Sequence, residues 1–138
     1  MYQSIKPDSK PLPGEEWRRC IYPFIRYEVS NYGRVRHART KQLVTFYIPK
    51  SPKQSKGWKP YKEIIIRVKN KMRHPLVHRL VAFAFIPLPD DSLFIKYEVD
   101  HIDGDKMNNR VENLRWVTSS ENKRAYWALK RQREQQHG

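Results

Sequence analysis

The sequence predicts an α+β protein in which a small, mostly β N-terminal module precedes a strand–turn–strand–helix unit. Three observations support this prediction. Short β-type segments separated by Gly, Asn and Pro fill the first half of the chain. An apolar run between Pro75 and Pro87 has helical periodicity. Near the C-terminus, a turn at Gly104 separates two further β-type segments, and a helix start signal follows them.

The N-terminal module begins after a leader. Residues 1–15 are rich in Pro, Ser and charge, which favours a flexible segment. Tyr27–His37, "YEVSNYGRVRH", predicts a strand, a turn and a return strand, with Gly33 supplying the positive φ that a tight turn requires. "QLVTFYIPK" and "KEIIIRVKN" are further strand candidates, and "SPKQSKGWKP" between them predicts a basic loop. Residues 16–72 therefore form a mostly β module.

The second unit, residues 73–127, begins with "HPLVHRLVAFAFIP". Its apolar stripe predicts a core helix over Val77–Ile86. Because the apolar residues are nearly continuous, a buried strand also fits this run.

The strand–turn–strand–helix pattern follows. Lys96–His101 and Asn113–Val117 have β character, with the "IDGD" turn after the first of them. Thr118 fits a helix N-cap, and Glu121 three residues later completes a capping box. The helix should run to about Gln135, with residues 128–138 as its basic end. On its inward stripe, Asn122 stands at the start and needs a polar partner.

Four polar residues of this pattern predict a reaction site. Asp100 and Asn122 offer the hard oxygen ligands that hold Mg²⁺ or Mn²⁺. His101 titrates near neutrality and can take a proton from water. The carbonyl of Asn113 can hold the other ring nitrogen of His101 and fix the orientation of the ring. Neighbouring residues on a regular strand face opposite ways, so the strand must end or bulge for Asp100 and His101 to act together.

A metal, a base and a basic surface together indicate phosphodiester hydrolysis. Each residue also has a purely structural interpretation. Asp100 and His101 fit a hydrogen-bonded turn, Asn113 fits a strand-end bond to loop backbone, and Asn122 fits a helix cap. Neighbouring Asn109, like Asn108, is expected to brace the loop.

The net charge points to a polyanionic partner. Lys and Arg number 28 against 14 Asp and Glu, giving +14. Nucleic acid is favoured over a membrane surface, although a solvated basic face and a ribosome-like RNA binder also fit. No apolar run is long enough to span a membrane, and the N-terminus lacks the core of a signal peptide. Cys20 is the one cysteine, so no internal disulfide forms, which fits a reducing interior.

The candidate DNA contacts are basic residues beside the first turn, in the basic loop, on the last strand and on the final helix. They are Arg34, Arg36, Arg39, Lys41, Lys56, Lys59, Arg115, Lys123, Arg124, Lys130 and Arg131.

The motifs "VHRLVAFAFIP", "VDHIDGDKMNN" and "NLRWVTSSEN" resemble, in order and spacing, the HNH nuclease motif in its ββα-metal form, as found in phage and intron-associated homing endonucleases. The segment "EEW…YEVSNYGRVR" resembles the nuclease-associated modular domain that often precedes HNH domains. The resemblance covers roughly residues 16–127.

The resemblance implies roles for the same four residues. His101 would be the general base, Asp100 and Asn122 the ligands of one divalent metal, and Asn113 the residue that orients His101. The family cuts double-stranded DNA to leave 3′-hydroxyl and 5′-phosphate ends. The zinc-bearing branch uses paired Cys motifs, so a single cysteine predicts no structural zinc.

Two alternatives to a homing endonuclease stay open. One is a DNA-binding protein whose HNH fold no longer cuts, and the other is a sequence-tolerant phage nuclease for DNA processing or packaging. Larger members carry a C-terminal DNA-binding region, so recognition here should rest on the N-terminal module, the basic helix and the termini. A phage-encoded enzyme would act in the host cytoplasm, as a monomer or a dimer.

Overall fold

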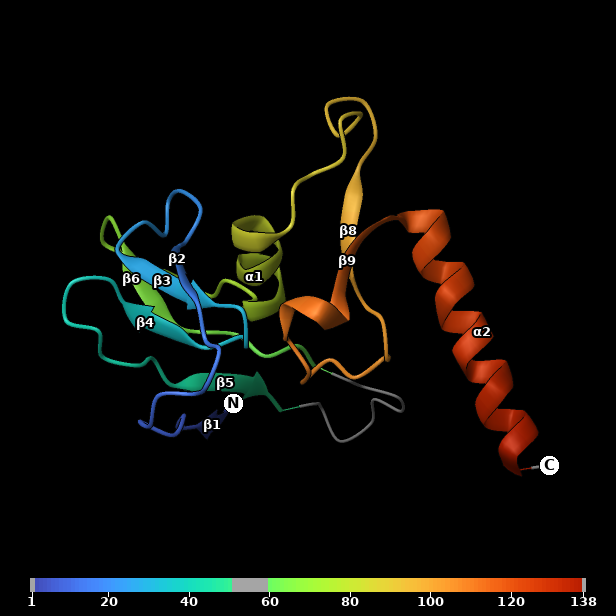
Figure 1. Cartoon of the computed structure of the whole chain (residues 1–138), viewed down its shortest axis with the longest axis horizontal. Coiled ribbons are helices and arrows are strands. Elements are labelled where there is room, and N and C mark those ends of the chain that lie inside the picture. The colour runs from blue at the N-terminus through green and yellow to red at the C-terminus, as the bar shows by residue number, and fades with distance from the viewer. Residues whose placement is uncertain (1, 51–59, 138) are drawn as a thin grey trace.

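The computed structural model describes residues 2–50 and 60–137. Its N-terminal half contains three small antiparallel sheets (Figure 1). Their strands are β1 (Tyr2–Ile5) with β5 (Phe46–Pro49), then β2 (Trp17–Arg19), β3 (Tyr27–Ser30) and β4 (Val35–His37), and finally β6 (Ile66–Val68) with β7 (Lys71–Arg73). The predicted mostly β module is therefore present, and the chain has the expected α+β character.

The predicted hairpin between β3 and β4 is confirmed. Val29 faces Val35 in the antiparallel register, and both side chains are fully buried. Gly33 has a φ of +82° and donates its N–H to the Ser30 carbonyl, so the glycine serves the turn as the sequence predicted.

The prediction of a flexible leader over residues 1–15 is wrong for this structure. Tyr2–Ile5 pairs with β5, and Arg34 anchors the segment that follows. The Arg34 guanidinium donates to both carboxylate oxygens of Glu15, at 2.8 and 2.6 Å, and to the backbone carbonyls of Asp8 and Lys10. These contacts explain the order, because a buried guanidinium needs all of its donors satisfied.

The same contacts correct the prediction that Arg34 binds DNA. Each guanidinium nitrogen of Arg34 donates within the chain, and only 9% of the residue is exposed. Arg34 therefore stabilises the module instead of contacting a phosphate.

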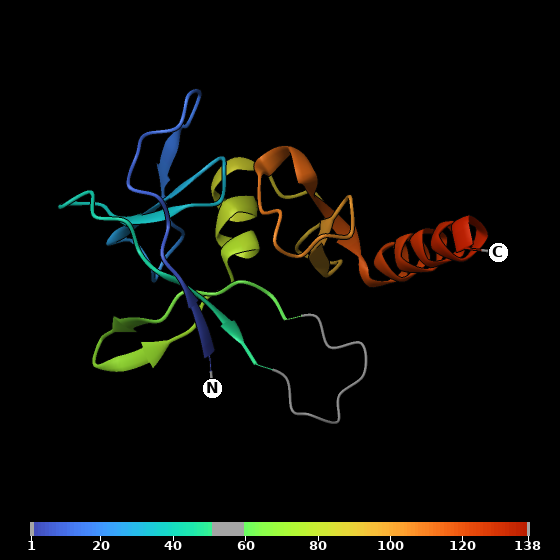
Figure 2. The same cartoon turned by 90° about the horizontal axis from the view of Figure 1, so that it is seen from below.

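The predicted core helix is α1 (Val77–Phe85). In Figure 2, α1 lies between the N-terminal sheets and the C-terminal unit. Val77, Leu80 and Val81 are buried in one cluster with apolar residues of both halves, from Val29 to Leu114. The two halves expected on either side of residue 72 thus share a single core, and α1 joins them.

The C-terminal unit consists of β8 (Tyr97–His101), a 3₁₀ turn (Val111–Asn113), β9 (Leu114–Thr118) and α2 (Ser119–His137). This is the predicted order, except that Asn113 belongs to the turn before β9. Thr118 Oγ1 accepts the N–H of Glu121 at 3.3 Å, which is half of the expected capping box. Figure 1 shows α2 extending away from the rest of the molecule. Neither of the helices described above is long and apolar enough to cross a bilayer.

We predict that Arg34→Met destabilises the protein by about 3 kcal/mol, because the Glu15 carboxylate, whose side chain is 4% exposed, is left buried without its cation. Urea unfolding measures the change. The exposed Arg39→Met is the control and should change stability by about 0.5 kcal/mol or less. Equal stability of the two variants would refute the anchoring role of Arg34.

Candidate active site

A pocket of about 260 Å³ lies between the end of β8 and the start of α2. It is lined by Tyr61, Val99, Asp100, His101, Gly104, Lys106, Asn122, Lys123 and Leu129. Three of the four predicted reactive residues, Asp100, His101 and Asn122, therefore meet in one place.

The pocket forms because β8 ends where the two reactive residues stand. Asp100 and His101 occupy the last two pairing positions of β8, opposite Arg115 and Leu114. The chain then turns, with the Gly104 N–H donating to the His101 carbonyl. His101 faces the core side and Asp100 the other side, and both reach the pocket at the open end of the strand.

The His101 ring is held from several sides. Its Nε2 lies 2.7 Å from Asn109 Oδ1, an oxygen that only accepts hydrogen bonds. Nε2 therefore carries the proton, and Nδ1 keeps its lone pair. The ring also contacts the rings of Tyr61 and His78, at centroid distances of 5.9 and 4.9 Å. This arrangement leaves His101 able to accept a proton at Nδ1.

Burial lowers the pKa of both His78 and His101. Burial lowers the pKa of His101, although the hydrogen bond with Asn109 and the charges of Asp100 and Asp103 oppose this shift. Burial, assisted by His101, lowers the pKa of His78 to about 3. The lowered pKa of His101 favours the unprotonated imidazole, the form that a general base requires.

The predicted role of Asn113 is wrong in this structure. Asn113 Oδ1 accepts the Asp103 N–H at 3.0 Å, and its Nδ2 donates to Asp103 Oδ1 and to the Asn108 carbonyl. The side chain points into the 103–108 loop because the 3₁₀ turn places it there. Asn113 thus braces the loop, and Asn109, predicted only as a brace, orients His101.

Asp100 and Asn122 supply the oxygen atoms that a divalent metal prefers. Asp100 Oδ2 also accepts a hydrogen bond from Arg115 Nε at 2.8 Å, so the predicted DNA contact Arg115 pairs with this carboxylate. Asn122 Nδ2 donates to Glu98 Oε2 at 3.0 Å. Thr118, and not Asn122, caps the N-terminus of α2. One carboxylate and one amide beside the same pocket fit Mg²⁺ or Mn²⁺, which keep several water ligands.

The geometry agrees with comparisons against known proteins. A family model described as HNH endonuclease matches residues 76–124, which contain α1, the pocket residues from β8 and the start of α2. These residues are therefore similar to the HNH endonuclease family. We refer to residues 76–124 as the HNH domain.

Similar proteins extend the likeness beyond the HNH domain. An uncharacterised HNH endonuclease of Acanthamoeba polyphaga mimivirus is 36% identical over 110 residues, which cover 78% of this chain and 25% of that protein. DNA endonuclease I-HmuI of Bacillus phage SP01 is 35% identical over 107 residues, covering 78% of this chain and 55% of that protein. H-N-H endonuclease F-TflII of Escherichia phage T5 is 30% identical over 105 residues, covering 76% and 49%.

The fold also matches a solved structure of DNA binding and cleavage by the HNH homing endonuclease I-HmuI. The TM-score is 0.64 at 32% identity, over 82% of this chain and 58% of that one. The match therefore includes much of the N-terminal module. The chain spans between a quarter and about half the length of the curated relatives it matches.

The N-terminal module contacts the HNH domain at the loop that orients His101. A Cβ built on Gly33 would lie 3.0 Å from both Asn109 Cβ and the Asn109 carbonyl oxygen. The Val111 N–H donates to the Asn31 carbonyl at 2.9 Å, and the Arg110 guanidinium lies 4.0 Å from the Tyr32 ring centroid. The turn of the β3–β4 hairpin is therefore packed against the segment that holds Asn109.

The predicted DNA contacts divide into two groups. Arg36 and Lys41 both donate to Glu28, at 2.7 and 3.1 Å, and Arg36 also stacks on Trp17. The others within the described residues, besides Arg34 and Arg115, are exposed: Arg39, Lys123, Arg124, Lys130 and Arg131. Lys56 and Lys59 lie outside the described residues.

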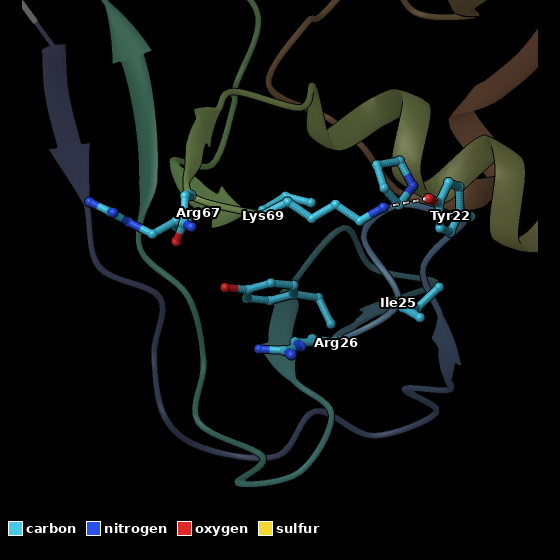
Figure 3. A pocket seen from close by; sticks show the side chains of 9 residues that line it. Tyr22, Ile25, Arg26, Arg67 and Lys69 are labelled. Atoms are coloured by element: carbon cyan, nitrogen blue, oxygen red, sulfur yellow. Dashed lines mark hydrogen bonds between the residues drawn. The ribbon is translucent and has the colours of Figure 1, made fainter.

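A second pocket, of about 520 Å³, lies within the N-terminal module (Figure 3). Exposed Arg26 borders it from the loop before β3, while exposed Arg67 and Lys69 border it from β6 and the turn after it. Lys69 Nζ donates to the Tyr22 hydroxyl at 3.2 Å. Sequence reasoning missed these three cations because Arg26 is far in the chain from Arg67 and Lys69, and none of them belongs to a recognisable motif.

We predict that Gly33→Ala destabilises the protein and disturbs His101. The positive φ alone costs about 1–2 kcal/mol for an L-residue, and the added Cβ displaces Asn109. Nitrogen-15 NMR of the His101 ring should then show a weakened preference for the Nε2–H tautomer. Val35→Ala is the control, since it removes buried packing from the same hairpin without adding atoms against Asn109. Identical His101 signals in wild type and Gly33→Ala would contradict the contact's role.

Proposed function

We propose that the chain is a metal-dependent DNA endonuclease of the homing type, acting in the host cytoplasm if it is phage-encoded. It would hydrolyse phosphodiester bonds to 3′-hydroxyl and 5′-phosphate ends. The observation that carries the proposal is the meeting of Asp100, His101 and Asn122 in one pocket, with the His101 lone pair kept at Nδ1. The names of the DNA endonucleases among the similar proteins support the choice of DNA.

The residues divide the chemistry as follows. His101 Nδ1 takes a proton from a water molecule whose oxygen forms a bond to phosphorus. The bond from phosphorus to the 3′ oxygen breaks, and that oxygen takes a proton from a solvent water molecule and leaves as the 3′-hydroxyl. A divalent metal, Mg²⁺ or Mn²⁺, held by Asp100 and Asn122 would neutralise the charge on the phosphate and the departing oxygen. Lys106 and Lys123 border the same pocket and attract the phosphate.

DNA affinity would come from other residues. The exposed cations are carried by α2 and, around the N-terminal pocket, by β6 and nearby loops. In Figure 1, α2 and β6 lie on either side of the β8–β9 hairpin. Phosphate contacts of this kind supply affinity that depends on charge and salt and little on base sequence.

The deciding experiment is incubation of purified protein with plasmid and phage genomic DNA in Mg²⁺ or Mn²⁺, followed by mapping of the ends. One site or a few would support a homing enzyme, and many sites a sequence-tolerant nuclease. Tight DNA binding with no cleavage would identify a binding protein instead. Full activity in chelator would remove the metal from the mechanism.

We predict that His101→Ala and Asn122→Ala fail in different ways. Loss of a general base typically costs about 10²–10⁴-fold in rate, and added Mg²⁺ should not restore it. Asn122→Ala weakens the metal site, so a higher Mg²⁺ concentration should recover part of its activity. Cleavage assays over a range of Mg²⁺ measure both variants.

Both variants must be folded, as judged by circular dichroism and thermal unfolding. DNA affinity of His101→Ala should stay close to that of the wild type, because exposed Lys and Arg side chains supply it. A folded His101→Ala that cuts at the wild-type rate would rule out the assigned base.

We predict that replacing Arg26, Arg67 and Lys69 together with Ala weakens duplex binding and flattens its salt dependence. Each lost phosphate contact lowers the slope of log affinity against log salt by about 1. Fluorescence anisotropy with a labelled duplex measures the slope. The control replaces exposed Lys10, Lys50 and Lys96, which lie outside the pocket. Equal slopes in the two triple variants would remove the N-terminal pocket from the DNA interface.

A further inference from the structure

Glu98 lies two residues before Asp100 on β8 and faces α2. Because side chains alternate along a strand, Glu98 and Asp100 share one face of the hairpin, while Val99 and His101 are buried on the other. Burial first, and then the charges of Glu98 and Asp100, raise the pKa of Tyr61, which lines the pocket. Glu98 is therefore close to the candidate metal site.

The contact that Glu98 makes is with an amide and not with a cation. Its Oε2 accepts a hydrogen bond from Asn122 Nδ2 at 3.0 Å. The chain carries 28 Lys and Arg residues, yet within the described residues none of them lies within 4.0 Å of the Glu98 carboxylate. Although the protein is strongly basic, the Glu98 carboxylate therefore contacts the side chain of Asn122, a candidate metal ligand.

This hydrogen bond determines which end of the Asn122 amide faces the pocket. A carboxylate accepts hydrogen bonds and donates none, so only Nδ2 of Asn122 can face Glu98. Oδ1 must then point away from Glu98, and it accepts no hydrogen bond from the described residues. A metal binds an amide through its oxygen, so an amide turned the other way would present N–H groups that a cation repels.

We propose that Glu98 is a positioning residue for metal binding, which holds Asn122 with its amide oxygen toward the ion. The proposal rests on the proposed function, because it needs Asn122 to bind a metal. Residues that orient metal ligands in this way typically account for about 10–100-fold in metal affinity or activity.

Two variants of Glu98 separate the contact from the charge. Glu98→Gln keeps the size of the side chain, but its own amide can donate or accept, so it no longer dictates the orientation of Asn122. Glu98→Asp keeps the charge, but it is one methylene shorter and withdraws the carboxylate from Asn122. The control is Glu112→Gln, which removes a charge from an exposed side chain paired with Arg110.

The primary measurement is Mn²⁺ binding to the full chain by electron paramagnetic resonance, without DNA. Both Glu98 variants should bind Mn²⁺ at least about 10-fold more weakly than wild type, and the control should match wild type. In cleavage assays, both should need more Mn²⁺ for half-maximal rate but approach the wild-type rate at saturation, because His101 is unchanged.

Three results would overturn the proposal. Wild-type affinity in both variants would show that Glu98 has no role, and wild-type affinity in Glu98→Asp alone would show that only its charge matters. A wild-type chain that binds no Mn²⁺ would remove the metal from the proposed function and the role of Glu98 with it. If the wild type binds Mn²⁺ but cuts no DNA, the proposed function fails while the Mn²⁺ affinities still decide the role of Glu98.

Discussion

The close contact between Gly33 and Asn109 is the constraint on which the active-site geometry depends. The proton on His101 is fixed by Asn109 Oδ1, and Asn109 is packed against a turn that belongs to the N-terminal module. A Cβ at Gly33 would be crowded against Asn109, at 3.0 Å from its Cβ and its carbonyl oxygen, and the Asn31 carbonyl of the same turn accepts the Val111 N–H. The residues that carry the family motif therefore do not complete the site alone. A module expected to serve DNA binding also supports the base.

The acidic and amide side chains of the HNH domain have two distinct tasks. Most of the acidic and amide side chains between β8 and β9 form hydrogen bonds within the loop that joins these strands. These bonds take the place of the backbone hydrogen bonds of a helix or a sheet. Asp103 accepts hydrogen bonds from the Asp105 N–H, Asn108 and Asn113. Burial raises the pKa of Asp103, but these bonds and the charge of His101 together outweigh it, so the pKa is lowered. Only Asp100 and His101, with Asn122 from α2, are left facing the pocket. The many polar side chains in this stretch are therefore present mainly because an ordered loop needs hydrogen-bond partners for its backbone.

Much of the fold could be predicted because local signals agree with the tertiary structure. Gly33 predicted the turn of the β3–β4 hairpin, the apolar stripe predicted α1, and Thr118 predicted the start of α2. The leader was mispredicted because its order comes from Arg34, which follows it in sequence and binds its carbonyl groups. Composition cannot reveal a partner contributed by a later turn, and the same contacts removed Arg34 from the predicted DNA-binding residues.

The sequence predicted correctly which site residues come together when their positions follow from the course of the backbone. It failed where a contact depends on the direction of a side chain. A strand end beside a helix start was enough to bring Asp100, His101 and Asn122 together. Asn109 and Asn113 lie on the same loop and carry the same functional group, and both are buried. Which of them reaches His101 depends on the 3₁₀ turn at Val111–Asn113, which directs Asn113 into the loop. The spacing of residues in the sequence does not predict which of the two asparagines contacts His101.

The structure also separates the groups that suit chemistry from those that suit affinity. His101 is 5% exposed and is enclosed by rings and an amide, so its properties are set by its neighbours in the chain. The candidate DNA-binding cations of α2 and those of the N-terminal pocket are exposed. Buried groups respond to packing and local hydrogen bonds, whereas exposed charges respond to ionic strength. Salt therefore acts on the exposed cations and leaves His101 nearly unchanged, so the proposed DNA binding and the proposed catalysis could be altered independently.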